Sequence, residues 1–432
     1  MQTPPAESAA PEPPAPLTLG ALDVQGIVII HADTLRADHL PAYGYGRDTT
    51  PTLDGYGWSV VVGDRATGSW TLPSTASFLT SLEPEHHGMV WMGTELVPLS
   101  ATTWPERLQA AGWATALYSG NRIAGPITGL DRGEDVVHAP PETPDNEHLD
   151  ALLGPALGWL DSLDPGTHFA LMLQPMDMHS PYLPSATDLA AFRQDPIPFS
   201  EGADGYDEHA FAQSWLDSDT AGRASIDAAV TDLYDADLLG LDRGVGALLH
   251  ELDNRGLLEH TLVVFSADHG ESLDDNGTGG FGHMHGWREE EVNIPLMLLN
   301  PGLAAGEQDC LASNMDVWPT IAAAIGLPPA EGVDGVDLGL GCRELVRGSH
   351  WQGHKKLSVL AVATTEAKLT LGCTPPTYGG TVAGPDRDPT EQTPLDQLPN
   401  PEELKSGLDA YTGEVVSELP ETRCGNNVLS VR

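Results

Sequence analysis

Positive charge is scarce in this chain. Of its 432 residues only 20 are Lys or Arg, against 63 Asp or Glu, which gives a formal net charge of −43. Such a field repels nucleic acid and anionic membranes, so we expect neither as a partner. A solvated acidic surface suited to saline surroundings explains the excess of carboxylates. A calcium-rich surface is the alternative, although the spacing of the carboxylates does not support it.

The chain also lacks any apolar run long enough to span a bilayer, which takes about 20 residues. Residues 1–23 are rich in Pro, Ala and Glu, lack the apolar core of a secretory signal, and predict a disordered linker. Such a linker often follows a bacterial export or lipidation signal. We therefore expect an exported protein, periplasmic, lipid-anchored or extracellular, whose signal is absent from this sequence, with a cytoplasmic location as the alternative.

Cysteine is rare and confined to the last third of the chain. The four residues allow three pairings, and none shows the C-x-x-C spacing of a metal site. If the protein is exported, we expect at least one pair to be bridged, whereas buried free thiols are the alternative. The residues are Cys310, Cys342, Cys373 and Cys424.

Runs of β-branched residues alternate with helical patterns from residue 24 to about residue 327. This alternation predicts an α/β fold with a large, mostly parallel sheet flanked by helices. The apolar residues that follow Tyr234 share one face of a helix, which packing alone explains. They are Leu238, Leu241, Val245, Leu248 and Leu249. We predict one domain over residues 24–328 and a smaller, loop-rich C-terminal subdomain over residues 329–432.

Two apolar runs end in groups that can bind a metal. Residues 26–32 precede Asp33, and residues 261–267 precede Asp268 and His269. Continuous apolar runs are typical of strands buried on both faces of a parallel sheet, and ligands of such sheets bind beyond the carboxyl ends of the strands. Carboxylate and imidazole are both good ligands for a divalent cation. A solvated Asp at a plain strand end is the alternative.

Two further segments carry candidate catalytic groups. A third apolar run, residues 169–174, is followed by His179, which Pro181 should hold in a stiff loop because it disfavours helix at the residue before it. A His held by a neighbouring carboxylate is the structural alternative. The segment 70–81 contains Thr71 and Pro73 and fits an ordinary helix start when taken alone.

Together these segments resemble the sulfatases, within the superfamily that also contains the alkaline phosphatases. The resemblance runs from about Val24 to Pro328, and it rests on motifs in their order along the chain. In one-letter code, residues 33–40 resemble D-T-L-R-A-D-H-L, residues 71–81 resemble C-x-P-S-R-x-x-L-L-T-G, residues 177–182 resemble D-x-H-x-P-Y, residues 266–271 resemble S-D-H-G-E, and residues 282–296 resemble G-H-G-H-x-L-Y-E-E-x-L-x-V-P-L.

The chain departs from the sulfatase pattern at four positions. Thr71 stands where sulfatases carry the Cys or Ser that is oxidised to formylglycine, and Thr75 replaces the Arg that supports it. Thr34 replaces the second of two adjacent metal-binding Asp residues, and Asn121 lies about where a Lys contacts the sulfate. A Thr side chain would at most be oxidised to a ketone. The resemblance therefore implies the sulfatase scaffold without formylglycine chemistry.

We predict that Asp33, Asp268 and His269 hold one divalent metal ion, with Thr71 as a further ligand and as the nucleophile. Mg, Mn, Ca and Zn all fit this mixed donor set. The resemblance implies that His179 contacts the ester. The leaving oxygen would be protonated by His283 or His285, which are alternatively metal ligands. A second metal would need ligands from Asp177, His283, His350 and His354, a set with no spacing argument behind it.

Three functions are compatible with these residues. Relatives with a Thr nucleophile, such as the lipoteichoic acid synthases and nucleotide phosphodiesterases, imply hydrolysis or transfer of a phosphoester. A sulfate ester hydrolase without formylglycine is the second possibility, and a catalytically silent binding relative is the third. The substrate would be a small-molecule or polymer-linked phosphate or sulfate ester. The sequence indicates neither the alcohol portion nor the oligomeric state.

Overall fold

The computed structural model describes residues 17, 22–92, 100–140, 147–352, 356–373, 376–383, 387–418, 423–424 and 427–428. The predicted linker, residues 1–23, therefore lies almost entirely outside the described residues. So does His354, one of the residues considered for a second metal.

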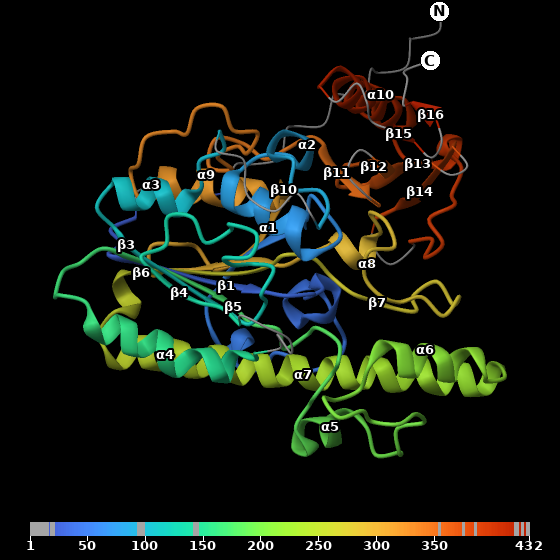
Figure 1. The fold of residues 1–432 in the computed structure, drawn as a ribbon, viewed down its shortest axis with the longest axis horizontal. Coiled ribbons are helices and arrows are strands. Elements are labelled where there is room, and N and C mark those ends of the chain that lie inside the picture. The colour runs from blue at the N-terminus through green and yellow to red at the C-terminus, as the bar shows by residue number, and fades with distance from the viewer. Residues whose placement is uncertain are drawn as a thin grey trace, which may run out of the picture.

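A sheet of eight strands forms the centre of the molecule (Figure 1). Its strands lie in the order β10-β2-β9-β6-β1-β5-β3-β4. They are β1 (Gly26–Ala32), β2 (Ser59–Arg65), β3 (Ala114–Ser119), β4 (Val136–His138), β5 (Phe169–Gln174), β6 (Thr261–Ala267), β9 (Leu296–Leu299) and β10 (Gly306–Ser313). All pairings are parallel except those of β9, which is antiparallel to β2 and β6. The predicted mostly parallel sheet is confirmed.

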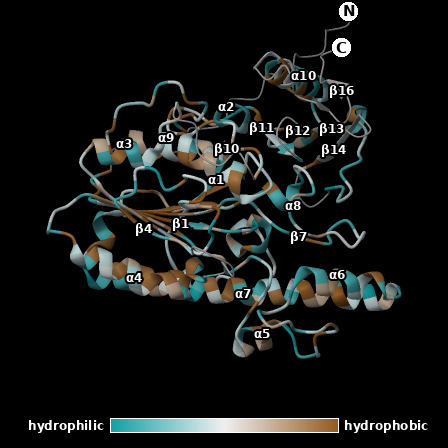
Figure 2. Cartoon of the chain, in the orientation of Figure 1, coloured by the Kyte–Doolittle hydropathy of each residue, from teal (hydrophilic) through white to brown (hydrophobic). Residues whose placement is uncertain are grey.

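Helices cover both faces of this sheet because its strands are apolar on both sides. Alternate residues of β1 enter different cores: Val28 and Ile30 pack with α4 and α7, and Ile27 and Ile29 pack with α1, α3 and α9. Figure 2 shows the central strands as the hydrophobic part of the fold. The covering helices are α1 (Thr71–Thr80), α3 (Trp104–Ala110), α4 (Leu149–Ser162), α7 (Thr220–Asn254) and α9 (Val317–Ala324).

Helix α7 is 35 residues long and contains the predicted apolar face. Leu238, Leu241, Val245, Leu248 and Leu249 are all fully buried, which confirms the packing interpretation of this face. Shorter elements lie around α7 and above the sheet edge. They are α2 (Pro84–His87), α5 (Ala186–Phe192), α6 (Glu208–Leu216), the hairpin of β7 (Ser272–Leu273) and β8 (Phe281–Gly282), and α8 (Glu289–Val292).

A second, smaller sheet follows the main one in the sequence, as expected for a smaller C-terminal part. It contains β11 (Val346–Trp351), β12 (Lys356–Ala363), β13 (Ala367–Cys373), β14 (Pro376–Val382), β15 (Arg423–Cys424) and β16 (Asn427–Val428). Helix α10 (Pro401–Glu418) packs on this sheet through Leu404, Leu408 and Tyr411. This part contains more regular structure than its Pro and Gly content predicts, because alternating apolar residues such as Leu357, Val359 and Ala361 form strands.

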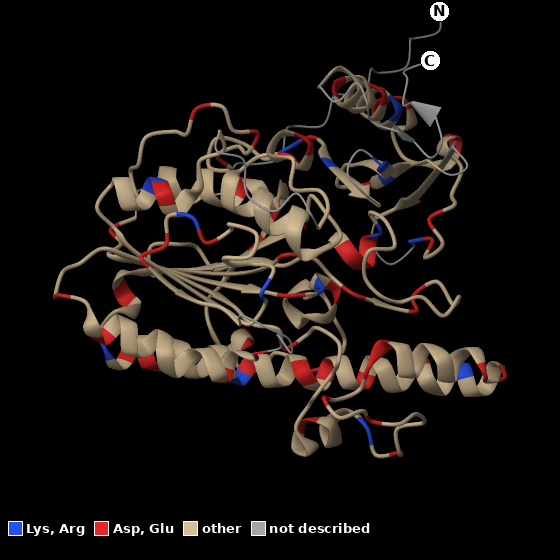
Figure 3. Cartoon of the chain, in the orientation of Figure 1, with Lys and Arg blue, Asp and Glu red and all other residues tan. Residues whose placement is uncertain are grey.

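The acidic residues are distributed over loops and outer helix surfaces, and few basic residues accompany them (Figure 3). None of the helices in the described ranges is long and apolar enough to cross a membrane. Cys310, in β10, forms a disulfide with Cys342, which lies 32 residues later. Cys373 is disulfide-bonded as well. The bridged form is thus the one present, which agrees with the expectation for an exported protein.

Candidate active site

The register of the sheet brings two acidic residues together. Strands β1 and β6 are adjacent and parallel, with Ala32 opposite Ala267, so that Asp33 and Asp268 follow at the same edge. The backbone N–H of Asp268 donates to the carbonyl of Ala32 at 3.2 Å, which continues the ladder by one bond. Both carboxylates are fully buried. Their proximity follows from two strands that end in register at the carboxyl edge of a parallel sheet.

Asp33, Asp268 and His269 form a group whose ligand atoms all lie within 4.8 Å of one another. His269 Nε2 is 3.6 Å from Asp33 Oδ1 and 3.6 Å from Asp268 Oδ2. His269 Nδ1 donates to the carbonyl of Gly270 at 2.9 Å, which leaves the Nε2 lone pair facing the carboxylates. Asp33 Oδ1 is buried and has no hydrogen-bond donor. Two carboxylates and a neutral imidazole around one point fit a divalent cation.

Thr71 adjoins this group as the first residue of helix α1. Its Oγ1 donates to Asp33 Oδ2 at 3.4 Å and lies 3.5 Å from His269 Nε2. Asn121 Nδ2 donates to the same Thr71 Oγ1 at 3.2 Å and to Asp33 Oδ2 at 2.6 Å. The N-terminus of α1 adds a partial positive charge where a developing oxyanion would sit. The hydroxyl is therefore held between a carboxylate and a neutral donor.

The start of α1 is fixed to the strand that carries the metal ligands. Ser74 Oγ donates to the backbone carbonyl of Asp268, and Asn314 Nδ2 donates to Ser74 Oγ at 2.8 Å. One turn along, Thr75 is fully buried and its hydroxyl has no hydrogen-bond partner. The Thr75 side chain therefore makes no polar contact to Thr71.

Two of the three candidate histidines lie beside the metal ligands. The rings of His269 and His283 have centroids 4.7 Å apart, and those of His179 and His283 are 5.2 Å apart. His179 Nδ1 donates to the carbonyl of Ser180 at 2.5 Å, which leaves Nε2 available. His285 instead turns toward Glu291, whose Oε1 is 2.7 Å from Nδ1. His285 thus lies next to the cluster rather than within it.

Burial and neighbouring charges change the proton affinities of the site. Burial, together with the charge of Asp33, raises the pKa of Asp268. Burial lowers the pKa of His269 to about 3, which keeps its imidazole neutral. Burial alone would also lower the pKa of His283, but the Glu271 carboxylate, 3.4 Å from Nδ1, raises it to about 9. The site therefore combines an imidazole that stays neutral with a neighbouring one that binds a proton readily.

Other residues considered from the sequence point elsewhere. The carboxylate of Asp177 accepts from the backbone N–H of Leu149 at 2.8 Å, and His350 Nδ1 pairs with Ser69 Oγ at 2.9 Å. Within the described residues, only the Asp33 group places three possible ligands together. Thr34 donates its hydroxyl to the carbonyl of Asp33 and adopts a φ of 54°, which is strained for a β-branched residue.

Several residues of the site were not identified by sequence reasoning. Gln174, at the end of β5, donates to Asp268 Oδ2 at 3.5 Å. Its position as a polar residue at the end of an apolar run was the sequence signal that could have identified it. Glu271 was part of a quoted motif but received no role. Glu208 has no local signal, because α6 brings it close to Gly282 and Glu271 only in the folded chain. Asn121 was noted only for replacing the sulfatase Lys, and in the structure it contacts Thr71.

Gly270, directly after His269, packs closely against the backbone of α8. A Cβ at this position would lie 2.2 Å from the carbonyl oxygen of Glu290, so only glycine permits the close approach of the two backbones.

The comparison with protein families identifies the scaffold. Residues 25–327 match the family model described as Sulfatase, which is more than half of the chain. The chain therefore belongs to the sulfatase family. It is 30% identical to human arylsulfatase A over 354 residues, covering 72% of this chain and 66% of that protein. It is 28% identical to the ulvan-active sulfatase of Formosa agariphila over 203 residues, covering 43% and 38%. The chain spans less than two thirds of the length of these relatives.

Solved structures show the same fold at low identity. A protein in complex with its substrate D-glucosamine-2-N,6-O-disulfate has a TM-score of 0.72 and 16% identity, covering 95% of this chain and 99% of that one. The phosphonate monoester hydrolase of Agrobacterium radiobacter has a TM-score of 0.68 and 18% identity, covering 92% and 96%. These likenesses extend the shared fold through the C-terminal sheet.

Proposed function

We propose that this protein is a metal-dependent hydrolase or transferase of phosphoesters that uses the unmodified hydroxyl of Thr71 as its nucleophile. The observation that carries the proposal is the position of Thr71 Oγ1, at the N-terminus of α1 and within 3.5 Å of both Asp33 and His269. Asp33, Asp268 and His269 would hold the metal, which would supply a Lewis acid for an ester oxygen and lower the pKa of the Thr71 hydroxyl.

The remaining steps use groups of the chain itself. Thr71 Oγ1 attacks phosphorus and passes its proton to Asp33 Oδ2, to which it is hydrogen-bonded at 3.4 Å, while Asn121 Nδ2 donates to the attacking oxygen. The bond from phosphorus to the leaving oxygen breaks, and the leaving oxygen takes a proton from His283, whose pKa the Glu271 carboxylate raises to about 9. Water then attacks the phosphothreonine and gives its proton to His283, the bond from phosphorus to Thr71 Oγ1 breaks, and Thr71 recovers its proton from Asp33.

His179 would stabilise the transferred group. Its ring lies across from that of His283, and its Nε2 is left available by the bond from Nδ1 to Ser180. Phosphoryl transfer depends mainly on positioning and charge stabilisation, which a metal, a helix N-terminus and two imidazoles can supply. The phosphonate monoester hydrolase among the structures of the same fold supports phosphorus chemistry on this scaffold.

A sulfate ester hydrolase is the second candidate, and the named relatives favour it. Arylsulfatase A and the ulvan-active sulfatase both match this chain. The objection is chemical, because the methyl group on Cβ of Thr71 prevents formation of an aldehyde. A sulfatase on this scaffold would have to pass through a sulfated Thr71 rather than through a hydrated aldehyde.

Substitution of Thr71 by Ala tests the proposal. The parent and the variant are loaded with Mg, Mn, Ca or Zn and offered 4-nitrophenyl phosphate and 4-nitrophenyl sulfate. We expect Thr71→Ala to abolish turnover and to keep metal binding, because the Asp and His ligands are unchanged. Thr75→Ala is the matched control, since it removes a buried hydroxyl without partners from the same helix and should leave turnover intact.

Mass spectrometry after a rapid quench with each ester in turn should show an adduct on Thr71. Phosphate and sulfate adducts have the same nominal mass, so the ester that was supplied identifies the group. Turnover of phosphate esters by Thr71→Ala at the parental rate would contradict the nucleophile and the mechanism. A parent that binds no divalent metal and turns over neither ester would support the silent binding relative instead.

A further inference from the structure

A pocket of about 160 Å³ lies between the turn at residues 285–288 and the C-terminal sheet. His285 and Arg288 line it from the turn, and Thr370 and Gln392 line it from the C-terminal side. His285, which lines the pocket, is two residues from His283, whose ring centroid lies 4.7 Å from that of His269. The backbone N–H of Met284, between these two histidines, donates to the carbonyl of Ser69 at 3.3 Å, two residues before Thr71.

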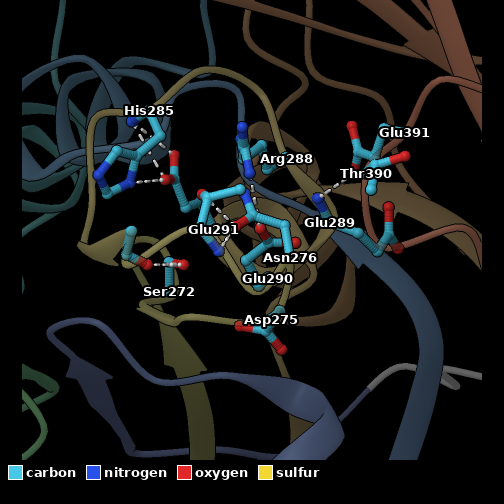
Figure 4. Close-up of polar contacts among 12 residues, drawn as sticks. Ser272, Asp275, Asn276, His285, Arg288, Glu289, Glu290, Glu291, Thr390 and Glu391 are labelled. Carbon is cyan, nitrogen blue, oxygen red and sulfur yellow. Dashed lines mark hydrogen bonds and ion pairs between the residues drawn. The ribbon is translucent and has the colours of Figure 1, made fainter. Parts of the chain in front are cut away.

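The acidic residues around this pocket pair with basic residues, and Figure 4 shows one of these pairs, Glu291 with His285. Each carboxylate of α8 and of the neighbouring loop pairs with its own cation. The pairs are Glu289 with Arg65 (2.6 Å), Glu290 with Arg387 (2.9 Å), Glu291 with His285 (2.7 Å), and Glu391 with Lys368 (2.6 Å). These cations come from four separate segments of the chain. The dense negative charge of α8 is therefore already compensated before any ligand arrives.

Arg288 is paired more loosely than these cations. It forms an ion pair of 3.6 Å with Glu290 Oε1, whose carboxylate Arg387 already binds at a hydrogen-bond distance. Its side chain is 31% exposed. Arg36, by contrast, is 3% exposed and bonds two carboxylates at 2.8–2.9 Å. A guanidinium offers five N–H donors in a plane, and the ion pair with Glu290 involves only Nη1 of Arg288, which lines the pocket.

The remaining lining can accept and donate hydrogen bonds around such an anchor. Thr370 Oγ1 donates to the carbonyl of Gly379 at 3.1 Å and keeps its lone pairs. Gln392 donates one amide hydrogen to the carbonyl of Thr390 at 3.3 Å, which leaves a second donor and the amide oxygen. Val359 supplies an apolar wall. Few polar groups around one fixed charge are typical of a small-molecule site.

We propose that this pocket binds an anionic group on the alcohol portion of the substrate and that Arg288 is its anchor. The inference deepens the proposed function, because it concerns the same ester and assigns a charge to its leaving alcohol. The net charge of −43 makes the chain as a whole repel an anionic ligand, and a cation at the pocket would offset this repulsion locally. The substrate class is then an ester of an alcohol that carries a second acidic group, such as a carboxylate.

Calorimetric titration of the metal-loaded protein with D-glucuronate and D-glucose tests the proposal. The two sugars differ by a carboxylate in place of a hydroxymethyl group, so their difference in affinity measures recognition of the anion. We expect the parent to bind glucuronate more tightly than glucose. Arg288→Gln should weaken glucuronate binding roughly 10- to 100-fold, as expected for hydrogen bonds to a charged group, and should leave glucose binding unchanged.

Two variants control for effects on the fold. Arg288→Lys keeps the positive charge but lacks the planar guanidinium, so it should retain part of the preference for glucuronate over glucose. Arg255→Gln removes an Arg that pairs with Asp161 and lies outside the pocket, and it should match the parent. Glucuronate should also inhibit hydrolysis of the 4-nitrophenyl ester competitively, and Arg288→Gln should raise the inhibition constant, whereas Arg255→Gln should leave it unchanged.

The outcomes separate this inference from the proposed function. A parent that binds both sugars equally, or not at all, would overturn the anionic subsite even if the aryl ester is turned over. The same conclusion follows if Arg288→Gln keeps the full preference for glucuronate. Failure of the proposed function appears instead in aryl ester turnover and in the Thr71→Ala variant.

Discussion

The buried carboxylates of Asp33 and Asp268, two of the proposed metal ligands, should destabilise the protein when no metal is bound between them. Ligand atoms of Asp33 and Asp268 lie within 4.8 Å of each other, and neither residue is exposed to solvent. With an effective dielectric constant of about 20, two unit charges at this distance repel by about 3.5 kcal/mol. Asp268→Asn removes that repulsion. We therefore expect the variant, in a chelator at pH 8, to be more stable than the parent by roughly 3 kcal/mol.

The hydrogen bonds of Asp268 can survive this substitution. Its Oδ1 accepts from the backbone N–H of Thr34 at 3.2 Å and of His269 at 2.7 Å, and the Asn oxygen can accept both. The new amide group would then face Gln174 Nε2, which now donates to Oδ2 at 3.5 Å. Because Gln174 Oε1 has no partner, a flip of the Gln174 amide would turn that oxygen toward the new donor.

Metal binding should have the opposite effect on the parent. A metal at 1,000 times its Kd stabilises the protein by about 4 kcal/mol. With an unfolding entropy of about 2.1 cal/mol/K per residue over 432 residues, 1 kcal/mol corresponds to a Tm change of about 1 °C. Scanning calorimetry should therefore show the metal raising the Tm of the parent by about 4 °C. In chelator, the Tm of Asp268→Asn should be about 3 °C higher than that of the parent. Addition of the metal should not raise the Tm of this variant comparably.

The pH dependence gives an internal control. Burial and the charge of Asp33 raise the pKa of Asp268, so the metal-free fold favours its protonated form. That stability is present below the ordinary pKa of an Asp and is lost as pH rises through the raised pKa. The advantage of Asp268→Asn should therefore disappear at low pH.

A second buried carboxylate provides the matched variant. Burial also raises the pKa of Asp237 on α7, so Asp237→Asn should stabilise the metal-free protein while keeping the metal response. If Asp268→Asn keeps the full metal-induced rise in Tm, Asp268 is not a ligand and the reasoning is refuted.

Two further predictions concern stability away from the metal group. Burial raises the pKa of Asp177 to about 6, so the stability that its protonated form contributes is present below pH 4 and lost as pH rises through 6. In urea unfolding at pH 8, the free energy of unfolding of Asp177→Asn should exceed that of the parent by up to about 3 kcal/mol. Equal stability of the two proteins at pH 8 would contradict the pKa shift. The disulfide of Cys310 and Cys342 closes a loop of 32 residues, so Cys310→Ser should cost about 3.5–4 kcal/mol in the same assay, and a loss below about 1 kcal/mol would contradict this value.

The sequence by itself determined the main elements of the site and the scaffold. Asp33, Asp268 and His269 each follow an apolar β-branched run, and such runs become adjacent parallel strands whose ends share one edge. Thr71 stands at a helix start that its own segment encodes through Pro73. These signals are local, because strand and helix formation depends on neighbouring residues, and they were therefore visible in the chain alone.

Only the tertiary structure decided which other groups reach these atoms. Asn121 and Gln174 contact the site because β5 lies beside β1 and β3 lies beside β5, and no local pattern distinguishes them from other strand-end amides. The acidic run at residues 289–291 looks uniform in the sequence, yet folding gives each carboxylate a different cation and pairs Arg288 only loosely. Charge pairing depends on distances between segments far apart in the chain, which is the physical reason that composition and spacing could not assign it.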